Sequence, residues 1–206
     1  MPQVLCPVLV GRDEEARRLR AALTAAGAGR GGTLFLAGEA GIGKTRLVRE
    51  IARTAGEQGL TVLTGRAVAG GAPTPFRPFA EALTAAGRAG RLPAGPDLGP
   101  FQPVLGRLIP QWRPVPVQPA PGQLAPGQLA PVQPAPVQPV PGEESPVFLG
   151  EAVLRLLRAL APPAGCVLVL EDLHWADRET LGLLEYLADN LATERVLCLA
   201  TVREDS

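Results

Sequence analysis

The sequence predicts an α/β fold of three layers, in which helices cover both faces of a mainly parallel sheet. Segments with strand character alternate along the chain with segments of helical spacing. Two runs, residues 33–37 and 166–170, are almost wholly apolar, as are strands that are covered on both faces. A glycine-rich turn at residues 38–45 joins the first run to a helix. These observations favour parallel strands linked by crossover helices.

Composition argues against several other classes of protein. The chain has 206 residues, a formal net charge of zero and three cysteines. Balanced charge gives no argument for a nucleic-acid-binding surface, and an odd number of cysteines argues against a disulfide framework. The N-terminus lacks the basic and apolar regions of a signal peptide, and no apolar run reaches the roughly 18 residues that would span a membrane. We expect a soluble, cytoplasmic protein without membrane contact.

The N-terminal part is predicted to form a helix, a strand and a second helix. Asp13 is expected to cap the first helix, whose buried face would include Leu19 and Leu23, four residues apart. The strand at residues 33–37 follows, and the second helix is expected over residues 44–58. The predicted buried stripe of this helix comprises Leu47, Val48, Ile51 and Ala55.

The middle of the chain differs in composition. A second strand is expected at residues 60–64 and a third helix at residues 79–86. Beyond them proline dominates, since 21 of the 23 prolines lie within residues 73–163 and a pentapeptide repeats five times over residues 116–140. Proline fixes φ and removes a backbone donor, so residues 87–148 are predicted to be a disordered, proline-rich insertion on the surface. A plain spacer is favoured, and a docking site for a proline-reading partner is the alternative.

Regular structure is predicted to return at residue 149. A helix is expected there, followed by a strand at residues 166–170, and Asp177 is expected to cap a helix that reaches Asn190. The last strand is predicted at residues 195–202. The residues expected inside are Val153, Leu156, Leu157 and Leu160 of the first helix, and Leu181, Leu184, Tyr186 and Leu187 of the second.

Residues 38–45 carry the clearest chemical signal. Their pattern is G-x-x-x-x-G-K-[ST], the phosphate-binding loop, or Walker A motif, and it stands between an apolar strand and an amphipathic helix. Backbone N–H groups of such a loop and the helix N-terminus bind phosphates. Lys44, the only lysine, has a compact ammonium that suits the β- and γ-phosphates, while Thr45 would bind Mg²⁺. The predicted nucleotide-binding residues of this P-loop are Gly38, Glu39, Ala40, Gly41, Ile42, Gly43, Lys44 and Thr45.

Two acids form the second signal. Glu171 and Asp172 end the apolar run at residues 166–170, which matches a Walker B strand. In that motif one acid approaches Mg²⁺ and the next orients or deprotonates the attacking water. By position Glu171 would be the metal-side acid and Asp172 the catalytic one, so Thr45, Glu171 and Asp172 are the predicted Mg²⁺ residues. Many P-loop enzymes carry aspartate first, and the short side chain of Asp172 affects the expected hydrolysis rate more than the expected binding.

The run at residues 170–177, Leu-Glu-Asp-Leu-His-Trp-Ala-Asp, resembles the Walker B region of the signal-transducing P-loop ATPases called STAND. In particular it resembles the Orc1-like AAA module of large LuxR-type transcriptional regulators. Residues 10–15, Val-Gly-Arg-Asp-Glu-Glu, match the family's start, which places Gly11 and Arg12 beside the nucleotide base. Arg203 resembles the family's sensor-1 arginine, a catalytic residue that faces the γ-phosphate.

The resemblance has implications for fold and function. It implies ATP and Mg²⁺ as cofactors, and a topology in which the strand at residues 195–202 inserts between the P-loop strand and the Walker B strand. Residues 1–86 and 149–206 would be the two parts of one P-loop ATPase domain around the insertion at 87–148. The family continues with a fifth strand, a lid and a DNA-binding helix-turn-helix. The fold is therefore expected to be incomplete at its C-terminus, with the P-loop strand at an open edge and no nucleic-acid contact from this segment.

Three functions follow as alternatives. The first is a regulatory switch, in which ATP·Mg²⁺ binding and slow hydrolysis control a signalling or transcriptional regulator, with self-association of the intact protein left open. The second is a turnover ATPase of the AAA type, a motor or loader, for which no arginine finger can be assigned in this chain. The third is a truncated fragment without independent activity.

Overall fold

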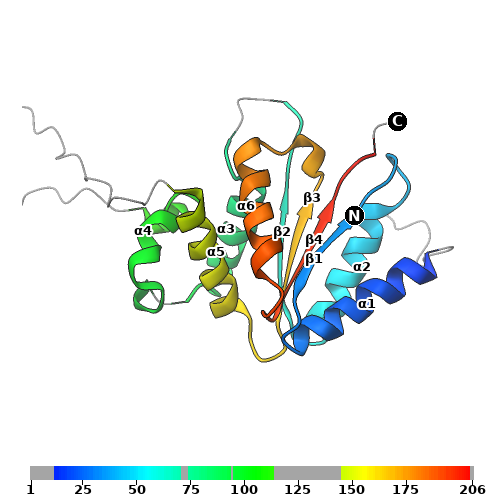
Figure 1. The fold of residues 1–206 in the computed structure, drawn as a ribbon, viewed down its shortest axis with the longest axis horizontal. Helices are drawn as coiled ribbons and strands as arrows, with labels where there is room; N and C mark the ends of the chain where they lie inside the picture. The colour runs from blue at the N-terminus through cyan, green and yellow to red at the C-terminus, as the bar shows by residue number, and fades with distance from the viewer. Residues whose placement is uncertain (1–11, 71–73, 94, 114–144, 205–206) are drawn as a thin grey trace, which may run out of the picture.

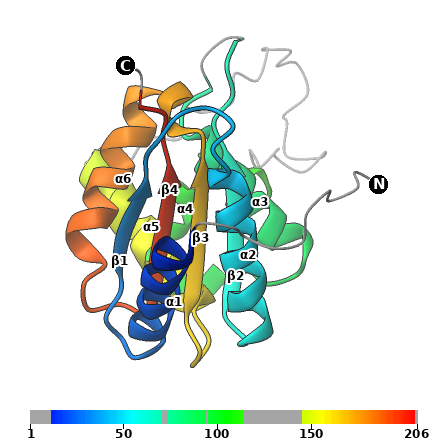
Figure 2. The same cartoon turned by 90° about the vertical axis from the view of Figure 1, so that its right-hand side faces the viewer.

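A computed structural model describes residues 12–70, 74–93, 95–113 and 145–204. Within them, four parallel strands form one sheet in the order β1-β4-β3-β2 (Figure 2). The last strand of the chain thus lies between the P-loop strand and the strand that carries the acid pair, which confirms the topology implied by the resemblance. The strands are β1 (Gly32–Leu36), β2 (Thr61–Arg66), β3 (Cys166–Glu171) and β4 (Val196–Thr201).

Helices cover both faces of this sheet, so the predicted three layers are confirmed (Figure 1). Val167 and Val169 of β3 pack with α1 and α2, whereas Leu168 and Leu170 pack on the opposite side with α3, α5 and α6. This alternation is the two-residue period of a strand. The helices are α1 (Asp13–Gly27), α2 (Lys44–Glu57), α3 (Arg77–Arg88), α5 (Pro146–Leu160) and α6 (Arg178–Asn190).

Most of the helical patterns were predicted correctly, because spacing along one helix is local information. All four residues of the predicted stripe on α2 are buried, and Asp177 caps α6 by accepting a hydrogen bond from the backbone N–H of Thr180 at 2.7 Å. Two details were wrong. Asp13 is the first residue of α1 and Arg12 holds the capping position. Leu181 is 46% exposed on α6.

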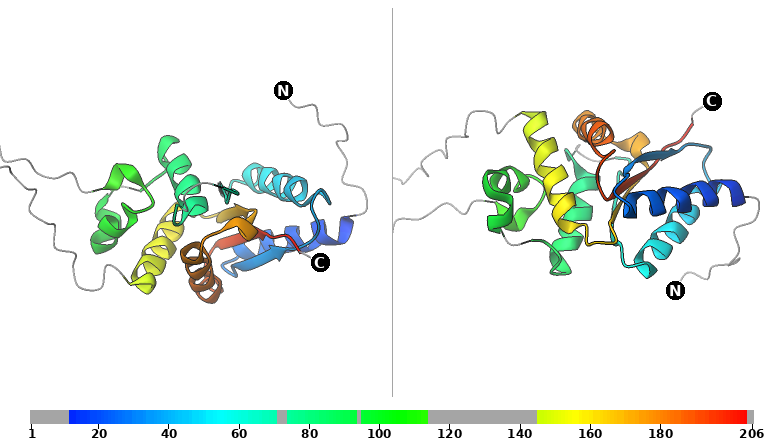
Figure 3. Two further views of the ribbon diagram at one scale, coloured as in Figure 1. Left: turned by 90° about the horizontal axis from the view of Figure 1, so that it is seen from above. Right: turned by 60° about the horizontal axis from the view of Figure 1, so that its bottom comes forward.

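Part of the predicted insertion belongs to the core. Residues 95–113 form three short helical segments, and Leu105, Leu108 and Ile109 are completely buried among α3 and α5. Figures 1 and 3 show α4 (green) alongside α5. The expected surface excursion from residue 87 is therefore wrong for this part. The segments are η1 (Gly95–Phe101), α4 (Gln102–Leu105) and η2 (Pro110–Trp112).

Proline density was a misleading signal there for a physical reason. Proline occupies the first turn of α4 and of η2, where its missing N–H costs nothing because that position has no intrahelical partner. Between these prolines the apolar residues keep a spacing that buries them. The repeat at residues 116–140 lies outside the described residues.

β1 borders the described sheet. Its ladder partner is β4, and the side chain of Phe35 is 57% exposed on the face that α6 partly covers. Cys166 and Cys198, on neighbouring strands, are buried free thiols, and burial raises the pKa of each to about 12. Among the described helices, none combines the length and apolarity needed to cross a membrane.

Candidate nucleotide-binding site

The P-loop joins β1 to the N-terminus of α2. Gly41 and Gly43 have φ angles of 79° and 96°, in the left-handed region that glycine adopts without strain. Gly43 is the capping residue of α2 and has no side chain that could cap the first N–H groups of that helix. A loop and helix end of this kind form an anion-binding site.

Lys44 lies at the centre of the loop and is only 8% exposed. Its Nζ donates hydrogen bonds to the carbonyl oxygen of Gly38 and, at 2.7 Å, to that of Glu39. The loop thus wraps around its own ammonium group. Both bonds are to neutral carbonyls, so phosphate oxygens would be stronger acceptors for the same charge.

Arg12 supports the loop from outside. Its Nη2 donates to the carbonyl oxygen of Ile42 at 3.0 Å, and its Nη1 lies 3.6 Å from a carboxylate oxygen of Glu15. The structure therefore links Arg12 to the P-loop, while its contact with a nucleotide base stays a prediction. Gly11, its predicted companion, lies outside the described residues.

The acid pair ends β3 at the same edge of the sheet. Glu171 is 5% exposed, and its Oε2 is buried without a hydrogen-bond partner among the described residues. Asp172 has a left-handed backbone, with φ 59°, and its N–H donates to the hydroxyl of Thr201 at 2.9 Å. Thr201 ends β4, so this bond ties together the carboxyl ends of two neighbouring strands.

Asp172 is also ion-paired. Its Oδ2 accepts from Nε of Arg66 at 2.7 Å and lies 2.5 Å from Nη2. The hydrogen bond and the charge of Asp172 raise the pKa of the Arg66 guanidinium above its usual value. Arg66 is anchored in turn by its backbone N–H, which donates to Glu81 of α3 at 3.0 Å.

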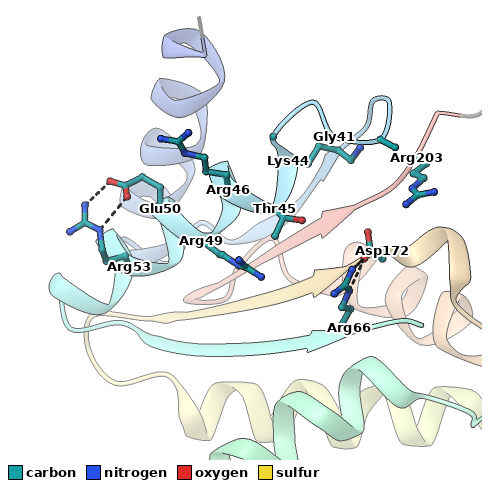
Figure 4. A pocket seen from close by; sticks show the side chains of 12 residues that line it. Gly41, Lys44, Thr45, Arg46, Arg49, Glu50, Arg53, Arg66, Asp172 and Arg203 are labelled. Carbon is teal, nitrogen blue, oxygen red and sulfur yellow. Dashed lines mark hydrogen bonds and ion pairs between the residues drawn. The ribbon is translucent and has the colours of Figure 1, made fainter. Parts of the chain in front are cut away.

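These elements surround one cavity of about 640 Å³ (Figure 4). Its lining contains six basic side chains and two acidic ones, so an anionic ligand is favoured. The predicted residues that line it are Ala40, Gly41, Gly43, Lys44, Thr45, Asp172 and Arg203. The other predicted residues that the structure describes are not part of this lining, namely Arg12, Gly38, Glu39, Ile42 and Glu171.

Several lining residues were missed from the sequence. They are Arg46, Arg49, Glu50 and Arg53 on α2, and Arg66 on β2. Thr201, bonded to Asp172, was missed as well. A signal existed for two of them, because Arg66 and Thr201 are polar residues that end apolar strands, and ligands bind at the carboxyl ends of parallel strands.

The neighbourhood of the acid pair fits Mg²⁺. The described residues hold no cluster of three or more His, Cys, Asp or Glu side chains suited to a metal, but Mg²⁺ commonly takes one or two carboxylates together with phosphates and water. The buried, unpartnered Oε2 of Glu171 is the observation that supports such a cation. The Thr45 hydroxyl, on the cavity wall, would be the second protein ligand.

His174 is the remaining polar residue of this segment. Both of its ring nitrogens are buried without a hydrogen-bond partner among the described residues, and its ring lies 5.1 Å from that of Trp175. This geometry supports a packing role.

Comparison with known proteins agrees with the geometry. Residues 8–199 match a family model described as the AAA ATPase domain. An uncharacterised protein of Rhizobium meliloti (strain 1021) is 28% identical over 201 residues, a match that covers 95% of this chain and 18% of that protein. The chain thus spans less than a fifth of this relative's length. With most of its residues matched and a P-loop between β1 and α2, the chain belongs to the AAA ATPase domain family, whose members are P-loop nucleotide-binding proteins.

Proposed function

We propose that this chain is the ATP-binding module of a regulatory switch, in which ATP·Mg²⁺ binding and slow hydrolysis control a signalling or transcriptional regulator. The observation that carries the proposal is the ion pair between Arg66 and Asp172, because it engages the acid expected to act on water. The resemblance of residues 170–177 to STAND proteins and LuxR-type regulators supports the regulatory context.

Five residues have distinct roles in this proposal. Lys44 exchanges its loop carbonyls for the β- and γ-phosphate oxygens, and Arg203 faces the terminal phosphate. Thr45 and Glu171 would hold the cation. Mg²⁺, when bound, supplies charge neutralisation at the phosphates. Asp172 assists at the cation and orients the attacking water.

Slow hydrolysis follows from the surroundings of Asp172. To act on water, the carboxylate must either break its ion pair with Arg66 or bind Arg66 and water at the same time. Aspartate also reaches less far than the glutamate found at this position in many P-loop enzymes. Sustained turnover in motors also needs an arginine from a neighbouring subunit, and none is assigned here. A cytoplasmic location and self-association of the intact protein are parts of the same proposal.

Binding of a fluorescent ATP analogue to the wild type, Lys44→Ala and the exposed-site control Arg17→Ala tests the proposal. We expect Lys44→Ala to weaken binding at least tenfold and Arg17→Ala to leave it unchanged. Equal affinities for wild type and Lys44→Ala would rule out the P-loop site. Steady-state hydrolysis above about 1 s⁻¹, within the usual range for enzymes, would favour the turnover ATPase over the switch.

A further inference from the structure

The cavity contains a guanidinium that the family pattern leaves unassigned. Arg49 lines it from α2, four residues after Thr45. Positions four apart lie on the same face of a helix, so Arg49 is one turn below the hydroxyl that is proposed to hold Mg²⁺. Side chains on a helix lean toward its N-terminus, and this direction points Arg49 at the P-loop.

Arg49 differs from Arg53 and Arg66 in having no partner among the residues that the structure describes. Arg53 of the same helix is bonded to Glu50 and Glu57, and Arg66 is bonded to Asp172. Arg49, by contrast, makes no hydrogen bond or ion pair within the part of the chain that the structure describes. In Figure 4 its side chain extends from α2 on the side that faces the Arg66–Asp172 pair.

The positive charge of the cavity wall favours an anionic ligand near Arg49. An unpaired guanidinium among five further cations, Lys44, Arg46, Arg53, Arg66 and Arg203, raises the positive potential of the cavity. An anion placed between Thr45 and Asp172 would lower it. A planar guanidinium is well suited to phosphate oxygens, which it can bind with two parallel hydrogen bonds.

We propose that Arg49 contacts the terminal phosphate of the bound nucleotide and sets the preference of the site for triphosphate over diphosphate. The inference rests on the proposed function, since it requires a nucleotide in this cavity. Loss of the terminal phosphate on hydrolysis would remove the partner of Arg49 and leave the P-loop contacts in place. Arg49 would thereby distinguish the two nucleotide states.

Dissociation constants for ADP and for a non-hydrolysable ATP analogue, measured by calorimetry in the presence of Mg²⁺, test the proposal. The variants are Arg49→Ala, Arg49→Lys, Arg53→Ala and Lys44→Ala. We expect Arg49→Ala to weaken triphosphate binding about tenfold, the scale of one hydrogen bond between charged groups, and to change ADP binding less than twofold. Arg49→Lys keeps the charge and should recover part of the loss.

Arg53→Ala is the matched control, because it removes one positive charge from the same wall at a guanidinium already paired with carboxylates. An equal change in the ATP-to-ADP ratio for Arg49→Ala and Arg53→Ala would overturn the inference, as would equal losses for ATP and ADP in Arg49→Ala. Unchanged binding of both nucleotides to Lys44→Ala would instead refute the proposed function. Thermal melts that match the wild type establish that Arg49→Ala is folded.

Discussion

The guanidinium of Arg66, at the end of β2, is bonded to the carboxylate of Asp172, at the end of β3, across 106 residues of sequence. The two strands are parallel neighbours, and their register pairs Arg66 with Glu171. The acid next in sequence therefore emerges within reach of the arginine. This contact makes the position of the acid that is proposed to act on water depend on Arg66 of β2.

Replacement of Arg66 by alanine should release Asp172 and raise the rate of ATP hydrolysis. Arg66 is largely exposed, and ion pairs of that kind contribute about 0.2–1 kcal/mol, so the increase should be at most about fivefold. Steady-state phosphate release measures it. The gain should be absent when Arg66→Ala is combined with Asp172→Asn, and Asp172→Asn alone should not raise the rate. A fall in rate with Arg66→Ala would mean that Arg66 assists the reaction.

The cap of α6 should contribute measurably to stability. Asp177 accepts two hydrogen bonds from Thr180, one from the N–H at 2.7 Å and one from the hydroxyl at 2.6 Å. Loss of such a cap costs about 1 kcal/mol, so Asp177→Ala should lower the free energy of unfolding by about that amount in urea titrations at pH 7. A change below about 0.3 kcal/mol would show that the bonds to Thr180 are replaced by water without cost.

The same carboxylate should make stability depend on acid pH. Burial alone would raise the pKa of Asp177, but hydrogen bonds from Thr180 and from the backbone of Asp177 and Phe76 lower it below its usual value of 3.8. Because the pKa is lower in the folded state, the contribution is present above about pH 4 and is lost as pH falls through the folded pKa. Asp177→Asn keeps a capping oxygen that does not titrate. Its deficit relative to the wild type should therefore shrink between pH 6 and pH 3, and a constant deficit would exclude the linkage.

Gly65 allows β2 and α3 to approach closely. A Cβ built there would lie 1.8 Å from the carbonyl oxygen of Pro78, so Gly65→Ala must displace backbone. We expect it to lower the free energy of unfolding by about 1–3 kcal/mol. Gly182→Ala, on the exposed side of α6 with no atom within 4 Å, should instead add about 0.5–1 kcal/mol through helix propensity. Chemical denaturation measures the free energy of unfolding of both variants and so separates a steric clash at Gly65 from a general effect of replacing glycine. Equal changes in the two variants would contradict the steric explanation.

The burial of α4 predicts a contrast within the proline-rich region. Leu105→Ala should cost about 2–5 kcal/mol, as expected for a fully buried leucine, whereas Val147→Ala at an exposed position of α5 should change stability by less than about 0.5 kcal/mol. Deletion of residues 121–130, two of the five repeats, should leave both stability and nucleotide affinity unchanged if the repeat is a spacer. A large loss on that deletion would favour the alternative of a specific docking role.

Features encoded by residues close together in the sequence could be predicted, whereas contacts between distant segments could not. The buried stripe of α2 and the buried strand β3 were predictable, because each is encoded by neighbouring residues. The contacts of Asp172 with Arg66 and Thr201 depend on how three strands align at one edge, which no local pattern contains. The same holds for Leu105, whose burial depends on packing against α5, while the prolines beside it indicated a loop.

The left-handed backbone of Asp172 means that the residue that is best for stability at this position differs from the one that is best for the proposed chemistry. A side chain at φ 59° costs on the order of 1 kcal/mol, and glycine would remove that strain together with the carboxylate. Selection of variants for heat resistance alone would therefore favour glycine here. The product would be a sturdier domain that lacks the carboxylate which the proposed switch uses to return to its resting state.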